Sequence, residues 1–413
     1  MLIVQKYGGT SVADTECIMR VAKRITAAFD KGHKLVVVVS AQGNTTNYLV
    51  NKASQINPHA SKRELDMLLT TGEQQSVALL AMAIHSLGYP ATSLTAGQVG
   101  IHATTTYGNA RIKNIETSRM LSEIERNNIV LVAGFQGINR YGDVTTLGRG
   151  ASDTTAVAIA AVLGADLCEI YTDVEGVYTA DPRLVPNAVK INEISYEEML
   201  ELSSLGVQVL HNRAVEMAKR YRIKLIVRSS MTETEGTLIK GDAPEMEKLY
   251  VSGIAVDDKI ARISLVGLAD RPGIAYQIFS LLAKAKISVD IILQSIGRDN
   301  SKDISFTVDN EDLAESLAVL TSQKDSIGFD SISHDNDIAK VSIVGAGMVT
   351  NFGVAAMMFE ALYDCGVNVN MISTSEIKIS VLISKNHVEK AMIAVHDKFV
   401  NNQIDFYKGG RGL

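Results

Sequence analysis

The chain opens with Met1-Leu-Ile-Val-Gln-Lys-Tyr-Gly-Gly-Thr-Ser11, and this stretch predicts a buried strand that ends in a glycine turn. Two glycines permit close approach of the backbone, and Thr10 or Ser11 is suited to cap a helix that follows. Peptide N–H groups at such a turn attract anions, and Lys6 adds a positive charge at the end of the strand. The order of lysine and glycines fits neither G-x-x-x-x-G-K-S/T nor G-x-G-x-x-G, so the stretch equally fits a structural turn with a solvated lysine.

The first part of the chain, to residue 240, alternates short apolar runs with helical patterns. Leu35–Ser40 and Ile129–Ala133 are typical of buried central strands, and Ser76–Leu87 is typical of a helix that ends at Gly88. This alternation indicates an α/β domain in which helices cover a mostly parallel sheet. Gly241–Glu247 is polar, rich in turn-forming residues and without periodicity, which indicates a linker.

Beyond the linker the sequence repeats itself once. Each copy has an apolar strand, a glycine turn, an amphipathic helix and further strands, which is the ferredoxin-like βαββαβ plan. The matching pairs are Ala261–Gly267 with Ala339–Gly345, Gly273–Ala275 with Gly353–Ala355, and Ile287–Ile292 with Val367–Ile372. Two copies are too few for a solenoid, so the repeat predicts a pair of small domains.

Composition narrows the class of protein further. The 413 residues suit two or three domains, and 40 Lys and Arg against 46 Asp and Glu give a net charge of −6, which argues against nucleic acid as a partner. The apolar runs are shorter than the ~18 residues of a membrane span, and the N-terminus lacks a secretion signal. We therefore expect a cytoplasmic protein that binds no membrane. Three scattered cysteines and eight dispersed histidines predict no metal site.

Two further loops carry candidate chemistry. In Thr145–Thr155, Arg149 stands between two glycines, which suits bidentate binding of a carboxylate. Ser152 or Asp153 in the same loop also fits a simple helix cap. Tyr171–Arg183 follows a strand and concentrates two aspartates and an arginine. It fits either an ordinary polar connection or a contact to phosphate or nucleotide.

Together these stretches resemble a known family. Lys6–Ser11, Leu147–Thr155 and Tyr171–Arg183, in this order and followed by the repeat, resemble the signatures of aspartokinases, which belong to the amino-acid-kinase superfamily. The resemblance spans essentially the whole chain. It implies a three-layer αβα amino-acid-kinase domain with a mostly parallel central sheet over 1–240, then a linker and strand over 241–258. Two ferredoxin-like ACT domains would follow, over 259–335 and 336–413.

The resemblance implies an aspartate kinase, an enzyme that uses ATP and Mg²⁺ to phosphorylate the side-chain carboxylate of L-aspartate to 4-phospho-L-aspartate. This is the first step of lysine, threonine and methionine biosynthesis. The physical chemistry is consistent with it, because a β-carboxylate with a pKa near ~3.9 is ionised at neutral pH and needs no general base. The site must instead supply fixed cations and N–H donors that let two anions meet.

The resemblance also assigns roles to single residues. Lys6 and Asp153 would be catalytic, the lysine at the ATP phosphates and the aspartate orienting substrate and lysine. Arg149 would hold a substrate carboxylate, and Glu73 would pair with the α-ammonium group, although Glu73 also fits a carboxylate stabilised by a helix dipole. The substrate-binding set is Ser40, Thr45, Thr46, Glu73, Arg149, Gly150 and Ser152, and the nucleotide-binding set is Lys6, Tyr7, Gly8, Gly9, Thr172, Asp173, Tyr178, Asp181 and Arg183. No residue is assigned to a metal.

By the same resemblance the repeats bind an effector, which is lysine, threonine or both. The lining residues would be Asp270, Ile274, Ala275, Val289, Asp290 and Gln294 in the first copy, and Val354, Ala355, Asn368, Val369, Ser375 and Glu376 in the second. An effector inhibits only if it binds the active and inactive conformations unequally. Alternatively the repeats serve only to join chains. We expect a homo-oligomer through the ACT domains, or a hetero-oligomer with a shorter subunit that starts at Met246.

Some positions depart from the common form of the family. Ala151 replaces a frequent glycine, which would strain a backbone of positive φ, and Gln208 stands where some relatives carry lysine. Phe352 and Ala355 replace a frequent proline and threonine in the second repeat. Two other functions stay open, namely a different amino-acid kinase, such as an acetylglutamate or glutamate 5-kinase, and a non-catalytic amino-acid sensor. An assay of substrate specificity would distinguish another amino-acid kinase from an aspartokinase. A non-catalytic sensor would show no turnover of ATP.

Overall fold

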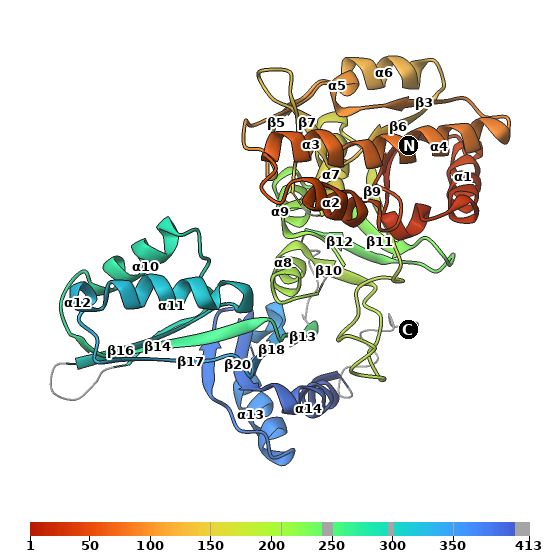
Figure 1. Ribbon diagram of the computed structural model, residues 1–413. Coiled ribbons are helices and arrows are strands. Elements are labelled where there is room, and N and C mark those ends of the chain that lie inside the picture. Colours follow the sequence, from red (N-terminus) through yellow and green to blue (C-terminus); the bar gives the residue numbers. More distant parts are fainter. Residues whose placement is uncertain (149, 208, 242–250, 296–300, 350, 401–413) are drawn as a thin grey trace, which may run out of the picture. The chain divides into compact units, whose positions relative to one another are not determined.

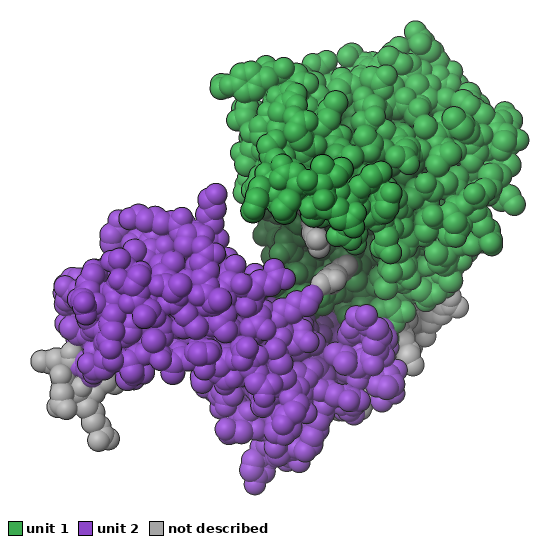
Figure 2. All heavy atoms as spheres, viewed as in Figure 1, with its two compact units in different colours: residues 1–178, 189–247, 405–413 green, residues 179–188, 248–404 purple. Residues whose placement is uncertain are grey.

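The structure is a computed structural model that describes residues 1–148, 150–207, 209–241, 251–295, 301–349 and 351–400 (Figure 1). Its internal contacts divide the described residues into two units (Figure 2). The first unit comprises 1–178 and 189–241, and the second comprises 179–188 and 251–400. No helix in these ranges is long and apolar enough to cross a membrane.

An eight-stranded sheet forms the centre of the first unit. Its strands are β1 (Leu2–Tyr7), β2 (Lys34–Val39), β3 (Ala91–Leu94), β6 (Ile129–Ala133), β9 (Leu167–Thr172), β10 (Glu193–Ser195), β11 (Leu225–Ser229) and β12 (Thr237–Lys240). They lie in the order β10-β12-β11-β9-β1-β2-β6-β3, and all neighbours run parallel except β11 and β12. The inner strands are continuous buried runs of Val, Ile and Leu, because helices cover both of their faces.

Helices on the two faces of this sheet complete three layers (Figure 1). The helices of the first unit are α1 (Thr15–Asp30), α2 (Thr45–Ile56), α3 (Lys62–Leu69), α4 (Thr71–Ser86), α5 (Ala96–Val99), α6 (Ser118–Glu125), α7 (Ala151–Leu163), α8 (Tyr196–Ser204) and α9 (Asn212–Tyr221), with a 3-10 turn η1 (Gly9–Val12). α1 and α4 share a hydrophobic core with Ile3 and Tyr7 on one face of β1. The side chain of Lys6 points to the other face of β1, where α7 packs. The predicted three-layer α/β domain is confirmed.

A second sheet of four short strands also belongs to the first unit. It contains β4 (Ile101–Ala103), β5 (Ile112–Ile115), β7 (Gln136–Ile138) and β8 (Val144–Thr146), in the order β5-β4-β7-β8. The sequence does not predict this sheet, because strands of three or four residues are too short to show an alternating pattern. The sheet matters for the site, since β8 leads directly into the glycine loop at 148–150.

The second unit contains two four-stranded antiparallel sheets with helices packed on them (Figure 1). The first copy of the repeat runs β14 (Ile260–Ala269), α10 (Ile274–Lys284), β15 (Ile292–Gln294), β16 (Ser301–Asp309), η2 (Asn310–Asp312), α11 (Leu313–Ser322), α12 (Lys324–Ile327) and β17 (Ser331–Asp335). Its sheet order is β15-β16-β14-β17, and the predicted ferredoxin-like plan is confirmed.

The second copy takes one strand from outside its own sequence. It runs β18 (Ile338–Val344), η3 (Ala346–Val349), α13 (Val354–Asp364), β19 (Met371–Thr374), β20 (Lys378–Ser384), η4 (Lys385–His387) and α14 (Val388–Val400). Its sheet order is β13-β18-β20-β19, where β13 (Gly253–Asp257) precedes the first copy. The strand predicted within 241–258 thus completes the sheet of the second copy, and the first copy is inserted after it. Gly273 and Gly353 precede α10 and α13 with φ of 90° and 88°, so the repeat extends to the glycine turns.

One segment of the first 240 residues packs in the second unit instead of the first. Residues 179–188 leave the first unit after Tyr178 and return to it at Val189. Ala180 and Val185 in this segment are buried in the core of the second copy of the repeat, which explains why the segment lies there. The domain predicted over 1–240 does not anticipate this excursion.

Candidate active site

The carboxyl ends of β9, β1, β2 and β6 lie side by side at one edge of the central sheet. In parallel α/β sheets this edge is where ligands bind. Lys6, Ser40 and Thr172 lie at or directly after three of these strand ends. The fold therefore brings together residues that are far apart in the sequence, as the resemblance implied.

Lys6 and Asp153 form a nearly buried ion pair at this edge. Lys6 Nζ lies 2.7 Å from Asp153 Oδ1, and the two side chains are 12 % and 9 % exposed. Asp153 is in the first turn of α7, where the helix dipole favours a carboxylate. The alternative that Ser152 or Asp153 caps this helix is wrong, because the N-cap position is Gly150, which has no side chain to accept from the first turn. Asp153 is therefore not needed as a helix cap and can hold Lys6.

The glycine turn after β1 is fixed by backbone contacts. Gly8 N–H donates to Tyr171 O at 3.2 Å, which joins the turn to β9. A Cβ on Gly9 would stand 2.6 Å from Ala41 O, so no side chain fits at this position. Tyr7 is fully buried and its ring stacks on Tyr171 with centroids 4.6 Å apart. Any contact of Tyr7 with a nucleotide must therefore come from its backbone.

The helix cap predicted from Thr10 or Ser11 is wrong. α1 begins later, and Asp14 caps it by accepting from Cys17 N at 2.8 Å. Ser11 is buried, and its hydroxyl donates to Ser230 Oγ at 2.8 Å. The residues in between form the short turn η1, so the glycine turn leads into the helix less directly than its sequence indicates.

Glu73 is a buried carboxylate with one oxygen unused. Its side chain lies in the first turn of α4 and the residue is 3 % exposed. Oε1 accepts from Ala41 N at 3.1 Å, whereas Oε2 has no hydrogen-bond partner among the described residues. Burial raises the pKa of Glu73 to about 7. An ammonium group bound at Oε2 would supply the missing partner and return this pKa toward its ordinary value.

The loop Ser40–Thr46 joins the glycine turn to this carboxylate. Ser40 N donates to Tyr7 O at 3.1 Å, and Gly43 N donates to Gly9 O at 3.0 Å. Thr45 and Thr46 are the first residues of α2. The predicted substrate residues therefore lie on a loop and a helix start that are tied to the end of β1 and to the glycine turn after it.

The second glycine loop surrounds a residue that the structure does not describe. Arg149 lies outside the described residues, as do Gln208 and Met246. Gly148 and Gly150 on either side have φ of 89° and 69°, and Ala151 is the first residue of α7. Since positive φ falls on the glycines, the alanine at 151 causes none of the predicted strain.

The predicted nucleotide-binding set is divided between the two units. Thr172 ends β9 and donates to Asp173 Oδ1, and Tyr178 pairs with Lys190, all within the first unit. Asp181 and Arg183 lie in the second unit. There the guanidinium Nε and Nη2 donate to the carboxylate at 2.7–3.1 Å, which lowers the pKa of Asp181. The nucleotide roles of Asp181 and Arg183 stay predictions.

Two residues beside the second glycine loop were not predicted from the sequence. A Cβ on Gly150 would meet the ring of His211 at 2.5 Å, so imidazole and loop are in close contact. His211 Nδ1 accepts from Arg213 N, and burial lowers the pKa of His211, opposed by the Asp153 carboxylate. Arg213 Nη1 donates to Leu147 O at 2.6 Å, which fastens the start of the loop. No motif distinguishes these residues from an ordinary helix start.

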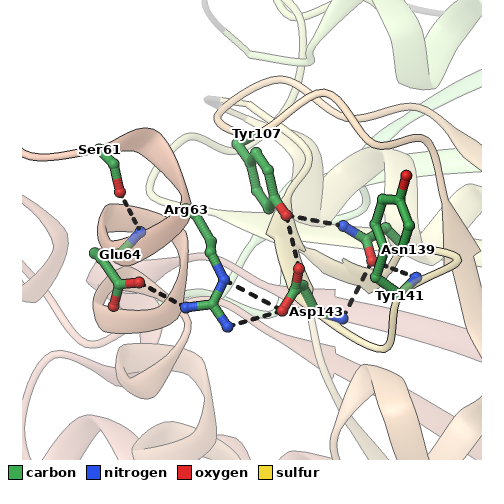
Figure 3. A network of polar contacts seen from close by, with 7 residues as sticks. All are labelled: Ser61, Arg63, Glu64, Tyr107, Asn139, Tyr141 and Asp143. Atoms are coloured by element: carbon green, nitrogen blue, oxygen red, sulfur yellow. Dashed lines mark hydrogen bonds and ion pairs between the residues drawn. The ribbon is translucent and has the colours of Figure 1, made fainter.

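A polar network holds the β7–β8 hairpin that leads into the same loop (Figure 3). Arg63 of α3 donates to Asp143 Oδ1 through Nε at 3.2 Å and Nη2 at 2.8 Å. Tyr107 donates to the other carboxylate oxygen at 2.7 Å, and Asn139 donates to the Tyr107 hydroxyl at 3.3 Å. Buried Asp66 adds bonds from the peptide N–H and hydroxyl of Thr146. The hairpin thus has a fixed position relative to α3.

The residues predicted to bind effectors lie in the second unit, and two of their carboxylates are in ion pairs. Asp270 contacts Lys302 Nζ at 2.7 Å, and Asp290 contacts Lys340 Nζ at 2.6 Å. Lys340 belongs to β18 and its side chain is 4 % exposed, so the second pair joins the two copies of the repeat. Among the other predicted residues, Ile274 and Val354 are buried and begin α10 and α13, and each is followed by a predicted alanine, Ala275 or Ala355. Val289 and Val369 are partly buried, and Gln294 ends the exposed edge strand β15. The exposed residues on either side of β19 are Asn368, Ser375 and Glu376. Phe352 is fully exposed.

Across the residues that the structure describes, no three His, Cys, Asp or Glu side chains come together as a metal site.

Comparisons with known proteins agree with the fold. Models of two families match, the amino acid kinase family over residues 1–229 and the ACT domain over 263–323 and 341–399. An aspartokinase of Bacillus sp. (strain MGA3) is 50 % identical over 398 residues, which cover 96 % of this chain and 97 % of the relative. Aspartokinase 2 of Bacillus subtilis (strain 168) is 51 % identical over 399 residues, with the same coverage.

Solved structures of similar proteins are also aspartate kinases. The enzyme from Synechocystis is 44 % identical, with a TM-score of 0.55, and the match covers 97 % of this chain and 69 % of that one. Aspartokinase III of E. coli, solved with aspartate and ADP, shares the fold with a TM-score of 0.82 at 24 % identity, over 96 % of this chain and 99 % of that one. With both family models and these relatives matched over nearly its full length, the chain belongs to the aspartokinase family and is an aspartate kinase.

Proposed function

We propose that the enzyme transfers the γ-phosphoryl group of ATP to the side-chain carboxylate of L-aspartate and forms 4-phospho-L-aspartate. This would be the first step of lysine, threonine and methionine biosynthesis. The observation that carries the proposal is the Lys6–Asp153 ion pair beside the glycine turn, at the ligand-binding edge of the sheet. A nearly buried cation held by a fixed carboxylate is suited to stabilise charge on a transferring phosphoryl group.

In the reaction an aspartate carboxylate oxygen attacks the γ-phosphorus, and the bond from that phosphorus to the β,γ-bridging oxygen breaks and leaves ADP. No proton has to be removed, since the carboxylate is already ionised. Lys6 would neutralise the phosphates. Because the N–H of Gly8 is used by Tyr171 O, the N–H of Gly9 is the better candidate for a phosphate contact. Asp153 would hold the ammonium group of Lys6 in position.

The aspartate substrate would bind between the two glycine loops. Glu73 would accept its α-ammonium group at the unused Oε2, and Arg149 would hold a carboxylate. The remaining proposed substrate contacts are Ser40, Thr45, Thr46, Gly150 and Ser152, and the proposed nucleotide contacts besides Lys6 and Gly9 are Tyr7, Gly8, Thr172, Asp173, Tyr178, Asp181 and Arg183. These two loops come from different parts of the chain, so the substrate would bridge them.

Mg²⁺ would enter with the nucleotide. The ion prefers phosphate oxygens and water, with one or two protein carboxylates at most. When bound, it would neutralise part of the phosphate charge.

We further propose that lysine, threonine or both inhibit the enzyme by binding the ACT domains. The enzyme would act in the cytoplasm as a homo-oligomer joined through these domains, or as a hetero-oligomer with a subunit that starts at Met246. The exposed edge strand β15 of the first ACT sheet supports association, because its three residues are all exposed and, among the described strands, it pairs only with β16.

The direct test is release of ADP from ATP in a coupled assay with L-aspartate, glutamate or N-acetylglutamate as acceptor. The proposal predicts turnover with aspartate and its decrease on addition of lysine, threonine or both. Turnover with another acceptor and none with aspartate would contradict the proposed substrate. Undiminished turnover with both effectors present would contradict the proposed regulation.

A further inference from the structure

The loop after β9 belongs to both units of the chain. Val177 N donates to Thr237 Oγ1 and Val177 O accepts from Ile191 N, both at 2.8 Å, and Tyr178 pairs with Lys190. These contacts fix the neck of the loop in the first unit. The ten residues between the two sides of this neck, Thr179–Ala188, pack in the second unit.

Hydrogen bonds attach the first residue of this segment to the second ACT domain. Thr179 O accepts from Ile254 N of β13 at 2.7 Å. Thr179 Oγ1 and His396 Nε2 of α14 lie 2.9 Å apart, and both residues are fully buried. Burial lowers the pKa of His396, so its ring is neutral at physiological pH and one of its nitrogens can accept while the other donates.

Apolar side chains complete the attachment. Ala180 and Val185 are 4 % and 1 % exposed, in one cluster with Met358 of α13 and Phe399 of α14. The same cluster includes Val354, the first residue of α13 and a proposed effector contact. A shift of α13 on effector binding would therefore act on the segment directly, because packed side chains leave little room for independent movement.

We propose that the segment Thr179–Ala188 is the connection through which the second ACT domain sets the position of the nucleotide-binding loop 172–178, with Thr179 and His396 as positioning residues. The inference rests on the proposed contact of this loop with ATP. The segment continues from Tyr178 through a single peptide bond, so the place at which Thr179 is held limits the conformations of the residues before it.

The test uses the full chain and compares Thr179→Val, which replaces the hydroxyl by a methyl group, with Thr179→Ser, which keeps the hydroxyl. Thr307→Val is the matched control, since Thr307 is also fully buried and its hydroxyl accepts from Ile291 N in the first ACT domain. We expect Thr179→Val to raise the KM for ATP about tenfold, as the loss of one buried hydrogen bond allows. The value of kcat and the KM for aspartate should change less than about twofold, and Thr179→Ser should behave as the wild type.

His396→Phe keeps an aromatic ring at this position and removes Nε2, the hydrogen-bond partner of Thr179 Oγ1. In a double-mutant cycle it should raise the KM for ATP by itself and add little to Thr179→Val, because both changes remove the same bond. A KM for ATP that stays at the wild-type value in folded Thr179→Val would overturn the inference. An equal rise in Thr307→Val would overturn it too, since the effect would then reflect general destabilisation.

Hydrogen exchange separates this inference from the proposed function. Amides in 172–178 should exchange faster in Thr179→Val than in the wild type, whereas Thr307→Val should leave them unchanged. This measurement needs no turnover, so it tests the connection even if the wild-type enzyme fails to phosphorylate aspartate. Unchanged exchange in Thr179→Val would refute the connection.

Discussion

Replacing Glu73 by Gln tests the substrate site through both stability and activity. The buried carboxylate has a pKa of about 7, against an ordinary value of 4.5. In the unfolded chain this group loses its proton first, so between these pH values the folded state holds a proton that the unfolded state has released. Stability therefore falls as pH rises from 4.5 to 7, and the full cost is present above pH 7.

The magnitude follows from the difference between the two pKa values. At 1.36 kcal/mol per pKa unit, ionised Glu73 lowers the free energy of unfolding by about 3 kcal/mol above pH 7. Glutamine keeps an acceptor for Ala41 N and cannot ionise. Glu73→Gln should then be more stable than the wild type at pH 8, with the difference shrinking toward zero near pH 4.5.

Urea unfolding of both proteins at several pH values, followed by circular dichroism without substrate, measures this difference. Activity should change in the opposite direction. Loss of a charged partner for the α-ammonium group should raise the KM for aspartate about 10- to 100-fold. The reasoning is refuted if the two proteins show the same dependence of stability on pH, or if Glu73→Gln binds aspartate as well as the wild type.

Five further variants test three other parts of the account. Lys6→Ala and Asp153→Ala should each abolish phosphoryl transfer, and each should destabilise the fold by about 3–5 kcal/mol because it leaves one nearly buried charge unpaired. The double variant Lys6→Met with Asp153→Asn should regain stability but not activity. Turnover at the wild-type rate in either single variant would remove that residue from the mechanism. Gly9→Ala should lower kcat/KM for ATP at least about tenfold, because its Cβ would stand 2.6 Å from Ala41 O; steady-state kinetics matching the wild type would show that the turn tolerates a side chain. Ser375→Phe, at an exposed position, should relieve inhibition by lysine or threonine without affecting basal turnover; an unchanged inhibition curve would place the effector elsewhere.

The general architecture could be predicted from the sequence because long periodic segments and a repeat encode it. The buried strand over Ile129–Ala133 agrees with β6 at both ends, and the glycine turns at 273 and 353 have the same conformation in both copies. Short strands such as β4 and β7 could not be predicted, since three residues show no period. The origin of β13 as the fourth strand of the second ACT sheet also had no local signal, because strand pairing depends on contacts distant in sequence.

The parts of the candidate site that belong to a sequence motif could be predicted. The parts whose position is set by tertiary packing could not. Lys6 and Asp153 form an ion pair, in agreement with the shared role that the resemblance implied. The helix caps were predicted wrongly, because the N-cap of α1 is Asp14 and not Thr10 or Ser11, and that of α7 is Gly150 and not Ser152. Arg213 fastens the glycine loop from a helix that starts more than sixty residues later, and no pattern in the sequence indicates that contact. The excursion of 179–188 was likewise hidden, because an apolar residue in a loop does not reveal which core it enters.

The most direct test of the central claim is a crystal structure of the enzyme with a non-hydrolysable ATP analogue, Mg²⁺ and L-aspartate. The account predicts the γ-phosphate beside Lys6 Nζ and the glycine turn, with the α-ammonium group of aspartate on Oε2 of Glu73. Both ligands bound away from the carboxyl edge of β1 and β2, or aspartate bound with Glu73 still unpartnered, would contradict it.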